Sequence, residues 1–175
     1  DFKYLRPASK QLTEGEALLG VSITGMMDNP KILLNSDYQR EGADHAVKVN
    51  KVWAKKLNIN QAARITCIKP EGTSSLVLGS ASGIHPHHSR RCFRRIQCNK
   101  LDPVYRHFKK SNPHMCEESV WSANKTDDVA TFPIVISDKA VVKDDITALQ
   151  HLKYIKSTQQ NWVIPCTTEV NVNNV

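Results

Sequence analysis

Residues 64–97 read RITCIKPEGTSSLVLGSASGIHPHHSRRCFRRIQ, and the pattern in this stretch decides the fold class. Its start belongs to a β-branched run, AARITCIK at 62–69, which predicts a short buried strand. Its end opens the segment RCFRRIQCN at 91–99, whose alternating side chains predict a second strand. Small residues and a helix start separate the two strands. This order of elements predicts an α/β protein.

The loop after the first strand is rich in small polar residues. Pro70 and Gly72 end the strand, and Thr73 or Ser74 is suited to cap a short helical turn. Such a loop exposes main-chain N–H groups that bind anions, and its hydroxyl groups donate to phosphate oxygens. Lys69 adds a positive charge. The pattern is not a P-loop, because the GxxxxGK[ST] spacing is missing. An ordinary strand-to-helix turn is the alternative interpretation.

Two longer segments have the period of amphipathic helices. In EGADHAVKVNKVWAKKLNIN at 41–60, the expected apolar face consists of Ala46, Val49, Trp53 and Leu57. The second segment is DDITALQHLKYIKSTQQNW at 144–162, which Asp144 or Asp145 is expected to cap. Its expected apolar face consists of Ile146, Leu149, Leu152 and Ile155.

Two shorter signals lie between these helices. Asp102 followed by Pro103 predicts the start of a short helix. The apolar residues of that helix are Val104, Tyr105 and Phe108. The segment VATFPIVI at 129–136 predicts a strand, in which Pro133 requires a start, an edge or a bulge.

The composition is that of a globular domain, with 175 residues of which 40% are hydrophobic. One domain over 1–175 is expected, and both ends of the sequence look truncated. No run approaches the roughly 18 to 20 apolar residues of a membrane helix, and the amino end lacks a signal-peptide pattern. The five cysteines have no CxxC spacing, so neither a disulfide framework nor a zinc ribbon is indicated. A cytoplasmic protein with reduced thiols is expected.

The net charge of +7 is concentrated in one segment. Residues 89–110 contain eight lysines and arginines and one acid, Asp102, while the rest of the chain carries equal numbers of basic and acidic side chains. A focused basic segment fits a phosphate-bearing ligand as well as a polynucleotide. A non-catalytic nucleotide- or RNA-binding module that uses residues 89–110 is therefore the alternative to an enzyme.

The histidines of GIHPHHSRR allow a metal site. His85, His87 and His88 lie near Cys92 in the sequence, but a fourth ligand at suitable spacing is absent, so zinc is the weaker interpretation. Histidines that form hydrogen bonds in a turn beside a pocket are favoured. Cys166 is more typical of a buried structural thiol than of a nucleophile, because free cysteine behaves as a small apolar residue.

These motifs together resemble a known family. ITCIKPEGTSSLVLGSASGIHPHHSRRCFRRIQ, with LLGVSITGMMD upstream and NWVIPCTTEVNVNNV downstream, is similar to the adenosylcobalamin-dependent (class II) ribonucleotide reductases. Among them, the sequence most resembles the single-chain ribonucleoside triphosphate reductases. The likeness runs from about Leu18 to the last residue, and KPxGTxS…GIHPHHxRR is its specific part.

The resemblance implies a position in the later part of a ten-stranded α/β barrel of the ribonucleotide reductase and glycyl-radical type. It also implies a loop that binds the substrate phosphates, formed by Lys69, Pro70, Glu71, Gly72, Thr73, Ser74 and Ser75. The implied border of the same pocket is Ser82, Gly83, Ile84, His85, Pro86, Arg90 and Arg91. The segment 20–25 resembles a strand and turn near the substrate.

The activity that the resemblance implies is reduction of a ribonucleoside triphosphate by a thiyl radical, with adenosylcobalamin as cofactor. The implied partners are the remaining part of the reductase polypeptide and a thioredoxin-type reductant. The radical cysteine is expected in an NPC-type motif upstream, and no such motif occurs in this sequence, so none of its cysteines is assigned a catalytic role. The sequence departs from the family pattern twice, with Glu71 in place of Ser and Cys166 in place of Gly.

Overall fold

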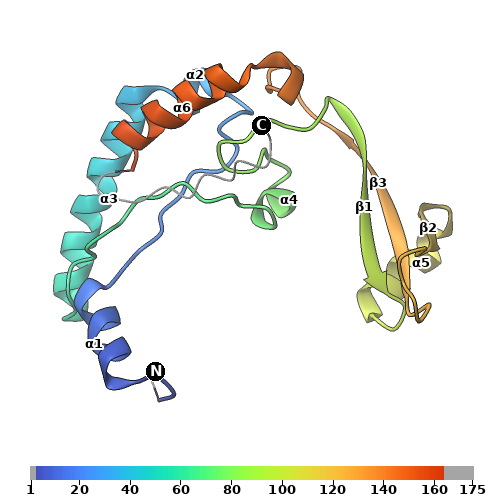
Figure 1. Cartoon of the computed structure of the whole chain (residues 1–175), viewed down its shortest axis with the longest axis horizontal. Helices are drawn as coiled ribbons and strands as arrows, with labels where there is room; N and C mark the ends of the chain where they lie inside the picture. Colours follow the sequence, from blue (N-terminus) through green and yellow to red (C-terminus); the bar gives the residue numbers. More distant parts are fainter. Residues whose placement is uncertain (1–2, 164–175) are drawn as a thin grey trace. The chain divides into compact units, whose positions relative to one another are not determined.

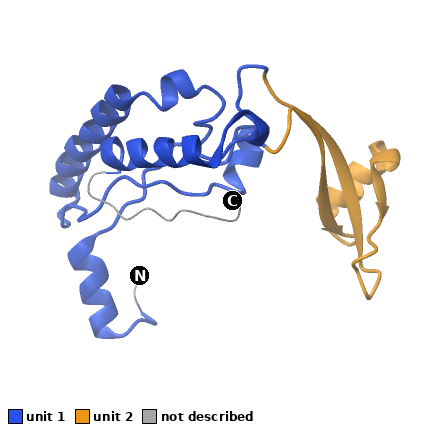
Figure 2. Cartoon of the chain, turned by 45° about the horizontal axis from the view of Figure 1, so that its top comes forward, with its two compact units in different colours: residues 1–87, 138–175 blue, residues 88–137 orange. Residues whose placement is uncertain are grey.

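A computed structural model describes residues 3–163 of the chain. The chain forms two compact units (Figure 2). Unit 1 consists of Asp1–His87 with Asp138–Val175, and unit 2 consists of His88–Ser137. Unit 2 is thus an insertion between two parts of unit 1. The interpretation of 1–175 as one segment of a barrel domain stays a prediction.

Unit 1 is mainly helical (Figure 1). Its elements are α1 (Pro7–Glu16), α2 (Pro30–Leu33), α3 (Ser36–Leu57), α4 (Ser74–Leu78), the 3-10 helix η2 (Lys143–Asp145) and α6 (Ala148–Asn161). The helix predicted at 41–60 is confirmed as part of α3. The Asn35 side chain caps α3 by accepting the N–H groups of Asp37 and Tyr38, and left-handed Asn58 ends the helix.

Helix α3 packs against α6 through small and polar residues. A Cβ added to Gly42 would lie 3.1 Å from the ring of Trp162, which follows α6. Gln39 donates from Nε2 to Thr158 Oγ1 at 3.2 Å. Ala43 is buried beside these contacts. Glycine and alanine therefore leave the room that the Trp162 ring needs.

The apolar face predicted for α3 differs from the buried face. Ala46 is half-buried as expected, whereas Val49, Trp53 and Leu57 are 40%, 53% and 61% exposed. Periodicity identified the bulky side chains, but α6 approaches the side of the helix that carries the small ones. Within residues 3–163 the bulky face of α3 stays exposed.

Helix α6 begins at a different cap from the one expected. The Thr147 side chain accepts the N–H of Gln150, and the Gln150 side chain accepts the N–H of Thr147. Asp144 and Asp145 do not cap the helix, because both belong to η2. The expectation of an aspartate cap was therefore wrong, since Thr147 and Gln150 satisfy two N–H groups reciprocally.

The apolar face predicted for α6 is divided. Ile155 is buried, and Ile146 is partly buried against the core. Leu149 and Leu152, by contrast, are 64% and 55% exposed. The buried face of α6 therefore includes Ile155 and Thr158 but neither of the two leucines.

The strand predicted at 62–69 is an extended segment that pairs, among the described residues, with residues 19–21. It runs parallel to residues 19–21, where Val21 and Thr66 form a bridge. Val21 N–H donates to Ile65 O at 2.9 Å, and Cys67 N–H donates to Val21 O at 2.9 Å. Ile65 and Thr66 are buried, as a strand interior would be. Within residues 3–163 this pairing is one isolated bridge, so the segment is extended there without forming a regular strand.

The hydrophobic core of unit 1 joins segments that are distant in the sequence. Its buried residues are Met26, Met27, Ala43, Ile68, Ala81, Ile84, Ile155, Trp162 and Val163. The turn at 26–27, the end of the extended segment and the loop at 81–84 thus share one core. Burial of this apolar surface holds the two loops together.

Unit 2 is a three-stranded antiparallel sheet with one helix (Figure 1). Its elements are β1 (Arg91–Asn99), α5 (Pro103–Ser111), the 3-10 helix η1 (Pro113–Met115), β2 (Cys116–Glu118) and β3 (Asp127–Val135). The strand order β1-β3-β2 puts β3 in the centre. The predicted strands at 91–99 and 129–136 are confirmed, and so is the start of α5 at Asp102 and Pro103.

Pro133 lies in the central strand without breaking its pairing. The register places it opposite Phe93. Ile136 N–H donates to Arg90 O, so the alternation of an antiparallel ladder makes the Phe93–Pro133 pair a non-hydrogen-bonded one. The proline nitrogen therefore faces away from β1, toward the side of β3 on which β2 lies. There β2 pairs only with residues 128–130, so Pro133 interrupts no hydrogen bond. The expectation that Pro133 requires a start, an edge or a bulge is therefore wrong for the strand, which is central, and the proline is accommodated because β2 does not extend to it.

The mixed α/β content expected from the sequence is confirmed. The sheet within residues 3–163 has three strands, so the ten-stranded barrel stays a prediction. In the part of the chain that the structure describes, no helix combines the length and the apolar character needed to cross a membrane.

Candidate functional site

The 69–75 loop connects the extended segment to α4. Lys69 N–H donates to Ser22 Oγ at 3.2 Å, which fixes the start of the loop to the segment before it in unit 1. Glu71 has a left-handed φ of 54° and turns the chain. Ser75 N–H donates to Glu71 O at 3.0 Å and closes the first turn before α4. Thr73 takes the predicted cap position, although its side chain makes no capping bond.

Three consecutive N–H groups of this loop have no acceptor among the described residues. They belong to Gly72, Thr73 and Ser74, all of which are exposed. Pro70 has no N–H group, and Ser75 uses its own within the turn. Because α4 has only five residues, the free N–H groups, and not the helix dipole, are what the loop offers an anion.

Glu71 engages two of the side chains that were expected to bind phosphate. Its carboxylate accepts a hydrogen bond from the Ser74 hydroxyl and lies 3.5 Å from Lys69 Nζ. The Ser74 hydrogen bond is the main cause that lowers the pKa of Glu71 below its ordinary 4.5, and the charge of Lys69 adds to it. In this arrangement Glu71 neutralises Lys69 and competes with an anion for Ser74.

The pocket-border segment 82–86 packs directly on the loop. The Ser82 hydroxyl donates to the Pro70 carbonyl. Gly83 has a φ of +55°, and a Cβ added to it would lie 2.3 Å from the Lys69 carbonyl oxygen. Only glycine allows this approach. The structure thus brings together two of the sequence-predicted segments, which are 12 residues apart at Ser82 and Pro70.

A third segment, 24–28, supports both loops. Thr24 Oγ1 accepts the N–H of Gly83 at 3.0 Å and donates to the Ala81 carbonyl at 3.0 Å. The N–H of Gly25 donates to the same carbonyl at 2.9 Å. This segment partly overlaps 20–25, which was expected near the pocket from the resemblance. Its contacts place Thr24 in the site, a role that no spacing in the sequence indicated.

Asp28 and His87 form a polar pair that closes the same region. Asp28 Oδ2 accepts the N–H of Ala81 at 2.9 Å, and Asp28 Oδ1 lies 2.5 Å from His87 Nε2. A Cβ on Gly25 would lie 2.8 Å from Asp28 Oδ2, and Gly25 has a φ of +74°. Sequence reasoning missed Asp28, because its partner lies 59 residues away.

His85, in the border segment, lies half-buried against His151 of α6. Its ring packs edge-to-face on His151, with centroids 5.6 Å apart, and its buried Nδ1 has no hydrogen-bond partner among residues 3–163. Burial is the main cause that lowers the pKa of His85 below its ordinary 6.5. His151 Nε2 in turn lies 3.1 Å from the Ile84 carbonyl. Of the histidines in this segment, His87 forms a hydrogen bond with Asp28 and His85 packs on His151, and the interpretation that they shape a pocket stays a prediction.

The described residues include no group of three histidine, cysteine, aspartate or glutamate side chains that could hold a metal ion. Arg90 and Arg91, two expected border residues, belong to unit 2 and not to the unit that carries the loop. There Arg91 is exposed, and Arg90 donates to the Ser137 carbonyl at 3.5 Å. Cys166 lies outside the described residues.

Comparison with known proteins gives one consistent result, although no family model matches the chain. An adenosylcobalamin-dependent ribonucleoside-triphosphate reductase from Euglena gracilis is 25% identical over 147 residues, which are 82% of this chain and 20% of that protein. The reductases of the same name from Lactobacillus leichmannii and Lactobacillus gasseri are 29% and 30% identical over 99 and 97 residues. These matches cover 57% and 54% of this chain and 12% of each relative.

A crystal structure of a B12-dependent (class II) ribonucleotide reductase superposes with a TM-score of 0.77 at 15% identity. The match covers 94% of this chain and 27% of that one. The fold is therefore that of part of a class II ribonucleotide reductase. In sequence the chain resembles the adenosylcobalamin-dependent ribonucleoside-triphosphate reductases, and the resemblance found in the sequence is confirmed. The chain spans about a fifth or less of the curated relatives it matches.

Proposed function

We propose that the 69–75 loop binds the phosphates of a ribonucleoside triphosphate in an adenosylcobalamin-dependent ribonucleoside-triphosphate reductase. The observation that carries this proposal is the row of free, exposed N–H groups at Gly72, Thr73 and Ser74. Phosphate oxygens are the acceptors that consecutive main-chain N–H groups bind best. The names of the relatives and their fold support the choice of substrate.

The surrounding residues give the loop the rigidity that such a site needs. Ser82 and Gly83 hold the Lys69–Pro70 main chain from one side, and Thr24 holds Gly83 from the other. Binding groups held in place before the ligand arrives cost less ordering entropy on binding. His85 and Pro86 then border the same pocket.

The rest of the activity belongs to the whole enzyme. There a thiyl radical would initiate reduction of the ribose, and a thioredoxin-type protein would restore the oxidised cysteine pair. Adenosylcobalamin, on which the relatives depend according to their names, would supply the radical chemistry. Among residues 3–163 no side chain is identified that would hold the corrinoid, so this chain is assigned phosphate binding and no step of the radical chemistry.

The test is a titration of the ¹⁵N-labelled chain with adenosine triphosphate and with inorganic tripolyphosphate, followed by amide chemical shifts. The N–H signals of Gly72, Thr73 and Ser74 are expected to shift together and to saturate. Gly72→Leu is expected to abolish binding, because its side chain would occupy the space in front of the N–H groups. A Cβ at Gly72 meets nothing within 4 Å, so the fold tolerates the change.

Gly15→Leu is the matched control, because a Cβ at Gly15 also meets nothing within 4 Å. This variant is expected to bind both probes as the unchanged chain does. Saturable binding that leaves the three amide signals in place, or survives Gly72→Leu, would contradict the proposal.

The alternative of an RNA-binding module is less well supported. Several cations of the basic segment are paired within unit 2, since Arg95 contacts Glu117, Lys100 contacts Glu118, and Lys109 contacts Asp128. Paired cations release fewer counterions on binding a polynucleotide.

A further inference from the structure

Strand β1 has a free edge with unpaired main-chain groups. β3 pairs with all nine residues of β1 on one side, and β2 lies beyond β3. Because Arg90 and Ile136 form a hydrogen-bonded pair, the alternation of the ladder turns the N–H groups of Phe93, Arg95 and Gln97 to the other side. Within the described chain these three groups have no acceptor. Such an edge is a template for one more strand.

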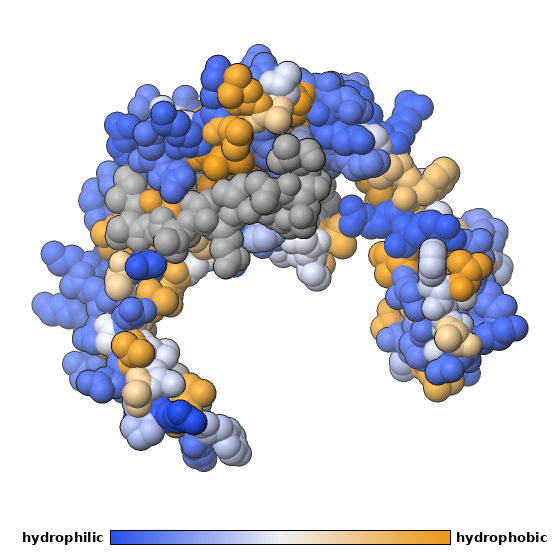
Figure 3. Space-filling view, viewed as in Figure 1, coloured by the Kyte–Doolittle hydropathy of each residue, from blue (hydrophilic) through white to orange (hydrophobic). Residues whose placement is uncertain are grey.

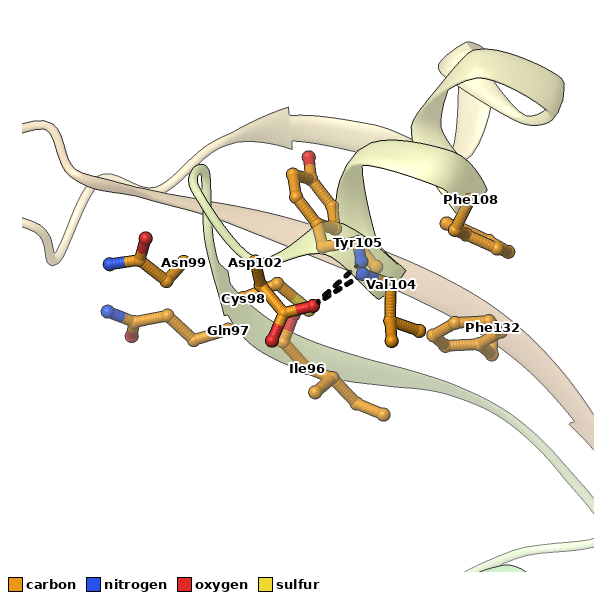
Figure 4. Close-up of a pocket in the computed structure, with 10 residues that line it drawn as sticks. Ile96, Gln97, Cys98, Asn99, Asp102, Val104, Tyr105, Phe108 and Phe132 are labelled. Carbon is orange, nitrogen blue, oxygen red and sulfur yellow. Dashed lines mark hydrogen bonds between the residues drawn. The ribbon is translucent and has the colours of Figure 1, made fainter.

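A pocket of about 420 Å³ lies beside this strand, between β1, β3 and α5 (Figure 4). Its walls include Ile96 of β1, Val104 and Phe108 of α5, and Phe132 of β3. The rings of Phe108 and Phe132 are 5.3 Å apart and form its apolar end. Val104 is 78% exposed although it points into this apolar space. An added strand on β1 would place every second side chain on this face of the sheet.

The positive charge of β1 indicates which kind of strand could pair with its free edge. Arg91, Arg94 and Arg95 give the strand three positive charges and it has no acid. Of these, Arg95 forms an exposed pair with Glu117. Pairing of β1 with β1 of a second copy would bring arginines together, which is unfavourable. An acidic strand would instead be attracted.

We propose that the free edge of β1 binds an acidic, extended segment of a separate polypeptide as an additional strand. Its main chain pairs with Phe93, Arg95 and Gln97, its carboxylates face Arg91 and Arg95 on the side of the strand opposite Ile96, and one bulky apolar side chain enters the pocket beside Ile96. The main-chain bonds provide affinity, and the pocket with the charge pattern provides specificity. This surface belongs to unit 2, so it does not depend on the function proposed for the 69–75 loop.

The probe is a fluorescein-labelled peptide with the same number of residues as β1, nine, in which glutamate alternates with leucine. Its binding to the complete chain is measured by fluorescence anisotropy. A peptide of the same length with lysine in place of glutamate serves as the charge control. We expect saturable binding of the acidic peptide and binding of the lysine peptide that is weaker by about tenfold or more.

Phe93→Pro tests the main-chain pairing. Proline removes an N–H group on the free side and no hydrogen bond of the β1–β3 ladder, so the fold should persist. Phe93→Thr is the control, because it removes the same ring but keeps the N–H group. The proline variant is expected to weaken peptide binding by about tenfold relative to the threonine variant.

Val104→Trp tests the pocket, because the larger side chain fills it from α5. His107→Trp adds the same ring to an exposed position of α5 outside the pocket lining. Only the Val104 variant is expected to lose peptide binding. Far-ultraviolet circular dichroism checks that each variant is folded. If the Phe93 variants do not fold, the comparison of Val104→Trp with His107→Trp still decides the test.

Three outcomes would overturn the proposal. The first is that the lysine and glutamate peptides bind equally well, or that neither Phe93→Pro nor Val104→Trp changes the affinity for the acidic peptide. The second is binding of a polyuridylate oligonucleotide without binding of the acidic peptide, which would assign the surface to nucleic acid. The third is a dimer that Phe93→Pro dissociates while the peptide fails to bind, which would assign the edge to a second copy.

Discussion

Glu71 sets the charge of the 69–75 loop. Its carboxylate holds the Ser74 hydroxyl and Lys69, the two side chains best suited to assist a bound anion. Glu71→Gln removes the negative charge and leaves Lys69 unneutralised. We therefore expect tripolyphosphate to bind about three- to tenfold more tightly to this variant. Isothermal titration calorimetry at low salt measures the change.

Glu41→Gln is the matched control for this experiment. Glu41 is exposed on α3, so its removal changes the net charge by the same amount without altering the loop. An affinity that rises equally in both variants would show that net charge, and not the contacts of Glu71, governs anion binding.

His85 makes unit 1 sensitive to acid. Burial lowers the pKa of its imidazole from the ordinary 6.5, and the neighbouring His151 lowers it further. The unfolded chain therefore binds the proton more readily than the folded chain. The neutral His85 stabilises the fold fully above pH 6.5, and this stabilisation is lost as the pH is lowered below that value. We therefore expect the urea concentration at the unfolding midpoint to decrease when the pH is lowered from about 7.5 to about 5.5.

His85→Gln should flatten this pH dependence, because the side chain no longer titrates. His45→Gln, at an exposed position of α3, should leave it unchanged. A chain whose urea midpoint is constant over this range would contradict the role given to His85.

Asp128 is the polar centre that joins α5 to the sheet of unit 2. It is 2% exposed, and its Oδ2 accepts hydrogen bonds from Tyr105 Oη and Lys109 Nζ, both at 2.6 Å. Burial alone would raise the pKa of Asp128, but the Lys109 and Tyr105 hydrogen bonds outweigh it and lower the pKa. Burial and the same hydrogen bond raise the pKa of Tyr105. This carboxylate therefore stabilises unit 2 above its ordinary pKa of 3.8, and the contribution is lost as the pH falls below that value.

Asp128→Ala leaves the buried Tyr105 hydroxyl without its acceptor. We expect the free energy of unfolding of unit 2 to fall by about 1–3 kcal/mol. The control is Glu117→Ala, which removes an exposed carboxylate of the same sheet and should cost less than about 1 kcal/mol. Urea unfolding followed by the NMR amide signals of β1 and β3, which belong to unit 2, measures both. Equal costs for the two variants would show that burial of Asp128 does not matter.

At the level of elements, local patterns predicted the helices and strands well and their buried faces less well. Asp102 and Pro103 start α5 as expected, because a capping side chain and a proline act within one turn. The bulky face of α3 was assigned to the core, but α6 packs on the small residues Gly42 and Ala43. Which face a helix buries depends on its neighbour, and the neighbour is distant in the sequence.

At the scale of the whole molecule, both units expose large apolar side chains among residues 3–163, as the orange residues on each unit show (Figure 3). Val49, Trp53 and Leu57 form a continuous exposed stripe along α3, and α1 has no buried residue. Large exposed apolar patches mark surfaces that another polypeptide covers. The remaining part of a reductase is the covering that the proposed function supplies.

The chain alone is therefore expected to self-associate. Replacing Trp53 and Leu57 together by lysine should reduce the weight-average mass in sedimentation equilibrium. The free energy of unfolding should change by less than about 0.5 kcal/mol for each exposed site. Lysine at Met26 and Met27, which are fully buried, should instead unfold the chain. A monomeric parent chain would contradict the prediction.

The sequence by itself determined the α/β class, most helix and strand positions and the resemblance to class II reductases, because turns, caps and motifs act over a few residues. It also located the 69–75 loop and the 82–86 segment. Only the tertiary structure decided that Gly83 packs on the Lys69 carbonyl, that Asp28 pairs with His87, and that Glu71 engages Ser74. The first two contacts join residues that are distant in the sequence, and the third depends on a left-handed turn. Local periodicity does not specify such contacts, because they arise when the core brings separate segments together.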